Sequence, residues 1–286
     1  MIISKIERQK KDKERYSLFV EDKFLIGVSE AILIHFALYK GQQISEDLLV
    51  EIKEAEYNHK VYNKAIHYLS FGLRTIKEMR DYLAEIPAFN SEEAQSNSED
   101  SQEISVIDET LIQSVIQRLS DQNYLNDLIY GQSYVRTHAL INRKGPRLMK
   151  QELLNKGLTE ATILTALEEY SEDQQVENLF YLGEKFIRTK KSLPPKMLRN
   201  KLQEYLLKKG FDRDLVQTSL TEFSFEDAEE RESDLLNKTA EKLLRTRQKK
   251  YSGYDLQNKM KESLYRKGFD FEAINQWIAD HSALFE

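Results

Sequence analysis

The feature that most constrains the fold is a four-residue pattern that recurs three times in the second half of the chain. Each copy consists of a lysine, a glycine, a large apolar residue, and a threonine or an aspartate. The copies occupy residues 156–159, 209–212 and 267–270, and their glycines lie 53 and then 58 residues apart. Internal periods of this length are typical of helical-repeat proteins, in which each unit stacks on the next one.

Apolar pairs at i, i+4 spacing flank each copy of the pattern, as expected for one buried face of a helix. Around the first copy these pairs are Met149 with Leu153 and Ile163 with Leu167. The glycine adopts a positive φ readily and ends the first helix, and the threonine or aspartate two residues later has the oxygen needed to cap the next helix. The pattern therefore predicts a tight joint between two helices, and its structural glycines are Gly157, Gly210 and Gly268.

A further helix precedes each pair and carries two apolar residues followed by arginine, at 134–136, 186–188 and 243–245. The unit is thus three helices in about 50–58 residues. A fourth copy lies upstream, where Thr75 starts a helix and Ile112, Ile116 and Leu119 form the third-helix stripe. We predict repeats at 45–120, 121–171, 172–225 and 226–286. The first repeat carries an acidic insert at about 88–105, which we expect to be disordered because it has almost no large apolar residues.

The N-terminal 44 residues differ from the repeats. Apolar and polar residues alternate over 16–20 and 24–28, which predicts a β-hairpin, and residues 1–6 are a candidate third strand. We expect Ser29 to cap a helix that runs to about Tyr39 and ends at Gly41, and Ser45 to start a longer helix toward Phe71. The predicted fold class is mostly α, with tandem three-helix repeats in an elongated curved array and a small N-terminal β-hairpin extension.

Several classes of function are disfavoured by composition. The chain has no cysteine, which removes disulfides and thiol chemistry and fits a cytoplasmic location. Its five histidines form no metal-binding spacing, and neither a phosphate-binding glycine loop nor a G-x-S-x-G motif occurs. The most apolar stretch, 24–39, is too short to span a bilayer, and no signal peptide is visible. We therefore expect no catalytic residues, no metal, no cofactor and no membrane association, and a hydrolase is the weakest alternative.

The net charge of −6 conceals an uneven distribution. Residues 89–110 hold seven acidic residues and no basic one, whereas 185–201 hold seven basic residues and no acidic one. Basic residues outnumber acidic ones by six to one in both 136–156 and 238–250. A strip of this kind suits a polyanion or an acidic protein surface, although solvated helix faces are the simpler explanation for any single run. The candidate binding residues are Arg136, Arg143, Lys144, Arg147, Arg188, Lys190, Lys191, Lys196, Arg199, Arg245, Arg247, Lys249 and Lys250. We expect most aromatic residues to lie in the core, since no alternating basic and aromatic platform is visible.

Three stretches of the sequence resemble the RecX family. Residues 118–127, which end in Tyr-Leu-Asn-Asp and lead into 134–135, are similar to the family's hallmark at the start of a repeat. The Lys-Gly-Pro-Arg run at 144–147, continued by 151–157, resembles the family's second helix. The first repeat of the family has similar residues at 68–70, 74–75 and 78–80 of this chain. The predicted N-terminal hairpin resembles the extension found in Gram-positive members of the family. The acidic insert departs from the usual compact first repeat, and Pro194-Pro195 replaces Gly-Pro in the third.

This resemblance implies a non-enzymatic regulator of the RecA recombinase. Family members bind along the RecA–DNA filament and inhibit its ATPase and strand exchange, in DNA repair, recombination and the SOS response, and many bind single- or double-stranded DNA directly. We accordingly expect a monomer whose partners are the RecA filament and DNA. Two alternatives remain open: a general nucleic-acid-binding repeat protein with no recombinase role, and an α-solenoid scaffold for an acidic partner.

Overall fold

The computed structural model describes residues 1–87 and 107–285. The described chain is mostly α-helical, with three-helix repeats after a small N-terminal β-sheet, as the sequence predicts. It divides into two compact units, Met1–Tyr130 with Lys156–Leu158, and Gly131–Asn155 with Thr159–Glu286. The predicted disordered insert at 88–105 lies outside the described residues, and the predicted repeat boundaries remain predictions.

The N-terminal sheet has three antiparallel strands in the order β1 (Ile3–Arg8), β2 (Arg15–Val20) and β3 (Lys23–Ser29). The candidate third strand is thus confirmed, and it starts two residues later than predicted. Ile3, Leu18 and Val28 are fully buried and pack with residues of the helices that follow.

The first helix, α1 (Glu30–His35), is capped by Ser29 as predicted but ends well before Tyr39. The prediction of its end is wrong because Ala37 takes a φ of +45° and Leu38 N–H donates to the Leu33 carbonyl at 2.9 Å, which closes the helix. The segment after this turn pairs with the start of the chain. Ile3 N–H donates to the Gln42 carbonyl at 3.0 Å, and Gly41 N–H donates to the Ile3 carbonyl at 2.8 Å. Gly41 takes a φ of +93° in this connection rather than at the end of a helix.

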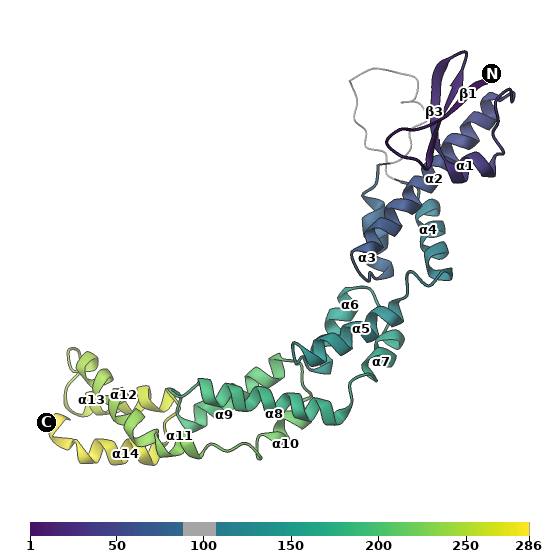
Figure 1. Cartoon of the computed structure of the whole chain (residues 1–286). Coiled ribbons are helices and arrows are strands. Elements are labelled where there is room, and N and C mark those ends of the chain that lie inside the picture. Colours follow the sequence, from purple (N-terminus) through teal and green to yellow (C-terminus); the bar gives the residue numbers. More distant parts are fainter. Residues whose placement is uncertain (88–106, 286) are drawn as a thin grey trace. The chain divides into compact units, whose positions relative to one another are not determined.

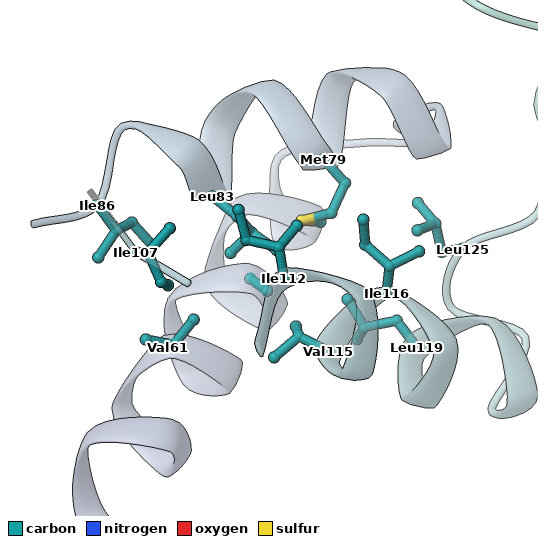
Figure 2. Packing of buried hydrophobic residues seen from close by; sticks show 11 residues of the cluster. Val61, Met79, Leu83, Ile86, Ile107, Ile112, Val115, Ile116, Leu119 and Leu125 are labelled. Carbon is teal, nitrogen blue, oxygen red and sulfur yellow. The ribbon is translucent and has the colours of Figure 1, made fainter. Parts of the chain in front are cut away.

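The first repeat consists of α2 (Glu46–Ser70), α3 (Ile76–Ala84) and α4 (Glu109–Asp121). Ser45 caps α2, and Thr75 forms a reciprocal capping box with Glu78, so both predicted helix starts are confirmed. The buried faces of the three helices meet in one apolar cluster (Figure 2), whose members include Val61, Met79, Leu83, Ile112, Ile116 and Leu119.

The later repeats follow the predicted three-helix plan (Figure 1). The second comprises α5 (Asp127–Leu140), α6 (Pro146–Asn155) and α7 (Glu160–Leu167). The third comprises α8 (Glu172–Thr189), α9 (Pro195–Lys208) and α10 (Arg213–Ser219). The fourth comprises α12 (Glu232–Arg247), α13 (Gly253–Arg266) and α14 (Phe271–Asp280), with the short helix α11 (Glu226–Glu230) before it and a 3-10 turn (Ser282–Phe285) after it.

The three joints have the predicted geometry. Gly157, Gly210 and Gly268 adopt φ values of +89°, +90° and +91°. In each joint the predicted residue, Thr159, Asp212 or Asp270, caps the next helix through its side-chain oxygen. Local sequence therefore sets both helix ends at every joint.

Candidate functional site

The joint glycines also form the contact between one repeat and the next. A β-carbon on Gly210 would lie 2.3 Å from Leu148 Cβ, and one on Gly268 would lie 2.7 Å from Met197 Cβ. In the first unit, a β-carbon on Gly157 would lie 2.6 Å from Lys77 Cβ. The second helix of one repeat thus packs against the joint of the following repeat.

Backbone hydrogen bonds reinforce the contact between the second repeat and the joint of the third repeat. Gly145 N–H donates to the Lys209 carbonyl at 2.7 Å, and Arg147 N–H donates to the Gly210 carbonyl at 2.9 Å. A β-carbon on Gly145 would lie 2.2 Å from the carbonyl carbon of Gly210. The Gly-Pro run before α6 is therefore needed for backbone-to-backbone contact as well as for starting a helix.

Most candidate basic residues of the second repeat are neutralised within the protein. Arg136 Nη1 lies 3.2 Å from Glu169 Oε2, Lys144 Nζ lies 2.7 Å from Glu152 Oε1, and Arg147 hydrogen-bonds to Asp212. Burial alone would raise the pKa of Glu152, but hydrogen bonds from Lys144 and from the Tyr134 hydroxyl lower it below its ordinary value. These ion pairs reduce the positive charge that the second repeat offers to a partner.

Arg143 is held inside the second unit in a different way. Its guanidinium donates to Asn178 Oδ1 and lies 3.9 Å from the centroid of the Tyr181 ring. Asn178 is buried and donates in turn to the Ala139 carbonyl at 3.0 Å. The backbone of Arg143 has a φ of +50°, so this network fixes an uncommon conformation in the loop after α5.

No carboxylate among the described residues forms an ion pair or hydrogen bond with the candidates of the third and fourth repeats, although the charge of Arg247 acts on Glu262 and lowers the pKa of that carboxyl. Four of them contact rings or a hydroxyl, and these contacts leave their charge uncompensated. Lys190, Lys196 and Arg199 lie 5.9, 5.4 and 4.7 Å from the ring centroids of Phe186, Tyr265 and Phe225, and Arg247 Nη2 lies 3.3 Å from Ser263 Oγ.

The remaining five candidates are exposed, and the described part of the chain offers their side chains no hydrogen bond, ion pair or ring contact. Arg188 and Lys191 flank Lys190 at the C-terminal end of α8. Arg245, Lys249 and Lys250 lie at the equivalent end of α12. Seven of the nine candidates therefore lie in two groups, one at the end of the first helix of the third repeat and one at that of the fourth, whereas Lys196 and Arg199 lie near the start of α9.

The sequence-based expectation that aromatic residues lie mostly in the core misses part of the surface. Tyr181, Tyr254, Tyr265 and Phe271 are 45–77% exposed. Two repeats also contain stacked aromatic pairs beside cations, which only the alignment of repeat positions could have revealed. These are Phe186 with Tyr205 (4.9 Å between centroids), flanked by Lys190 and Lys209, and Tyr68 with Tyr82 (4.2 Å), flanked by Arg74.

Other kinds of site find no support in the described residues. Within 1–87 and 107–285, no group of three or more histidine and carboxylate side chains is placed to hold a metal ion. None of the helices in the same residues has the length and apolar character required to cross a membrane.

Family models match most of the chain. The model for the regulatory protein RecX N-terminal domain matches residues 1–45, that for the second three-helix domain of RecX matches 126–167, and that for the third matches 172–220 and again 229–278. The chain belongs to the RecX family. The double match of the third RecX domain agrees with two similar units in the C-terminal half of the chain.

Relatives of similar length support this assignment. A regulatory protein RecX of Listeria monocytogenes serotype 4a is 34% identical over 288 residues, which cover 100% of this chain and 99% of the relative. One of Bacillus cereus is 35% identical over 281 residues, which cover 97% of both chains. A crystal structure of regulatory protein RecX superposes with a TM-score of 0.61 at 30% identity and covers 76% of this chain and 97% of that one. The chain is thus a member of a family of regulatory proteins.

Proposed function

We propose that this protein inhibits the RecA recombinase by binding the RecA–DNA filament, and so modulates its ATPase and strand exchange in DNA repair and recombination. The observation that carries the proposal is the set of uncompensated cations at the ends of α8 and α12. Membership of the RecX family supports the same function. The proposed partners are the RecA filament and DNA, and the proposed working form is a cytoplasmic monomer.

The charge distribution explains how such a surface would act. A nucleic-acid backbone is a dense polyanion, and each phosphate neutralised by lysine or arginine releases condensed counterions. The cations at the end of α8 project from one repeat and those at the end of α12 from the next, so a single chain offers two separate groups to one polymer. Engaging both at once raises the affinity beyond that of either group alone.

The proposal makes no use of catalysis. No described carboxylate or histidine lies in a cluster that would suit metal-assisted chemistry, and the cations that carry the proposal act by charge alone. Regulation then follows from occupying a surface of the filament, and no bond in any substrate needs to be made or broken.

The test is RecA-dependent ATP hydrolysis on single-stranded DNA, titrated with this protein. We expect ATPase activity to fall at protein concentrations that leave RecA bound to DNA, as measured in parallel by the fluorescence anisotropy of labelled DNA. A fall in ATPase only where RecA is displaced from DNA would identify a general nucleic-acid-binding protein. Loss of all binding to DNA and filament at moderate salt would instead favour a scaffold for another acidic partner.

A further inference from the structure

A cavity of about 530 Å³ lies in the first unit, between strand β3 and helix α2. Residues 24–27 of β3 line one side, and Lys53, Tyr57 and Lys60 of α2 line another. The three α2 residues are spaced i, i+4 and i+7, so they share one face of the helix. The cavity has the size of a ligand site, and its lining combines apolar surface with a few polar groups, as is typical of such sites.

A buried ion pair forms part of the cavity wall. Glu56 is 2% exposed, Arg15 Nη1 lies 2.7 Å from its Oε1, and Ser29 N–H donates to its Oε2 at 2.8 Å. Arg15 also donates through Nη2 to the Gly27 carbonyl at 3.0 Å. Because these two opposite charges compensate each other, the pair adds no net charge to the cavity.

The charge of the cavity therefore comes from Lys53 and Lys60. No carboxylate among residues 1–87 and 107–285 forms an ion pair or hydrogen bond with either lysine. Seven residues of helix separate them, which is about 10 Å along the helix axis. Side chains on one face of an extended peptide recur about every 7 Å, so carboxylates at alternate peptide positions fall within reach of both lysine side chains.

Strand β3 offers a backbone edge beside these lysines. It is an edge strand, because the order of the sheet is β1-β2-β3. The ion pair occupies this edge at Gly27 and Ser29, and the pairing register passes over Leu25, which has no partner residue in β2. Phe24, next to Leu25, is 63% exposed. An exposed strand edge of this kind can pair with an extended peptide, and the ion pair restricts that pairing to the segment before Gly27.

We propose that this cavity binds an extended acidic peptide of a second protein, which adds as a strand to β3 and places carboxylates on Lys53 and Lys60. Nucleic acid is a poorer occupant, because a phosphate backbone has no N–H groups to pair with the carbonyls of a strand edge. The inference goes beyond the proposed function, since the site uses none of the cations at the ends of α8 and α12.

The test is the fluorescence anisotropy of a labelled peptide, Glu-Val-Glu-Val-Glu, titrated with the full chain. The variant K53E/K60E is compared with K40E/K64E, a control that changes the net charge equally at exposed lysines outside the cavity. We expect K53E/K60E, folded by circular dichroism, to bind the peptide at least about 10-fold more weakly, because like charges then face each other. The control should bind as the wild type does, and a peptide with glutamine in place of glutamate should bind the wild type as weakly as K53E/K60E binds the acidic peptide.

Amide hydrogen exchange tests the strand addition separately from the charge. We expect exchange in residues 23–26 to slow when the peptide is bound, because pairing with a new strand protects backbone amides. Unchanged exchange there, no binding of the peptide by the wild type, or equal binding by K53E/K60E and the wild type would overturn the inference. Displacement of the peptide from the cavity by oligothymidylate would identify a nucleic-acid site instead. Failure of the proposed function looks different, because it concerns the RecA ATPase and leaves peptide binding unchanged.

Discussion

Replacing Gly210 by alanine tests whether the joint glycines hold successive repeats together. Gly210 combines two properties, a φ of +90° and a close approach to Leu148 of the preceding repeat. An added β-carbon would lie 2.3 Å from Leu148 Cβ and 2.4 Å from the Leu148 backbone nitrogen. Because a backbone atom is among these neighbours, a change of side-chain rotamer cannot relieve the overlap.

The magnitude follows from the two effects separately. The left-handed backbone conformation costs an alanine about 1–2 kcal/mol. Forcing the second and third repeats apart adds about 1–3 kcal/mol, as for other overpacking substitutions. Gly41 offers a matched control, because its φ is +93° and nothing lies within 4 Å of its added β-carbon. We therefore expect G41A to lower the free energy of unfolding by about 1–2 kcal/mol, and G210A by about 1–3 kcal/mol more.

The assay is urea denaturation followed by circular dichroism, with G145A as a third variant. Gly145 has no positive φ, but its β-carbon would lie 2.2 Å from the Gly210 carbonyl carbon, so G145A isolates the contact from the backbone conformation. Equal losses for G210A and G41A, together with a G145A protein as stable as the wild type, would refute the view that close backbone contact joins the repeats.

Three further predictions concern charge and the insert. Glu78 accepts hydrogen bonds from Lys156 Nζ (2.6 Å) and Thr75 N–H (3.0 Å); burial alone would raise its pKa, but these bonds and the charges of Lys156 and Arg74 lower it. Because the pKa of Glu78 is lowered in the folded state, its ionised form stabilises the fold at any pH above the unfolded-state pKa, and this stability is lost as the pH falls through the folded-state pKa. We therefore expect E78Q to lower the free energy of unfolding by about 1 kcal/mol at pH 7. Urea denaturation at a series of pH values should show that the difference from the wild type disappears in acid. Deleting residues 90–103 should change the melting temperature little, because a solvated loop contributes mainly a small closure entropy, and a fall as large as that from losing a repeat would show that the segment packs. The logarithm of duplex-DNA affinity should fall with the logarithm of salt concentration at about −0.9 per phosphate neutralised, and a flat dependence would rule out an electrostatic interface.

Much of the fold follows from local sequence. The joint glycines, the helix caps and the apolar pairs act within a few residues, so the sequence was sufficient to predict the ends of helices at each joint. The end of α1 was not predictable in this way. The helix closes where Ala37 takes a φ of +45°, a conformation that favours glycine rather than alanine, so no residue type marked the end.

The candidate site was predictable only as a set of basic residues. Which of them remain uncompensated depends on contacts distant in sequence, such as Arg147 with Asp212 and Arg143 with Asn178. Those contacts exist because the packing of the second repeat against the third places the residues side by side.

The most direct test of the central claim is the inhibition of RecA-dependent ATP hydrolysis by R188E/K190E/K191E. These residues are exposed at the end of α8, and no described carboxylate neutralises them. The control K10E/K11E/K13E changes the net charge equally at exposed lysines of the N-terminal sheet connection. We predict that R188E/K190E/K191E, folded by circular dichroism, needs at least 10-fold more protein for half-inhibition, because like charges facing a phosphate or carboxylate surface cost several kcal/mol, whereas the control inhibits as the wild type does. Half-inhibition by the folded R188E/K190E/K191E protein at the wild-type concentration would contradict the account.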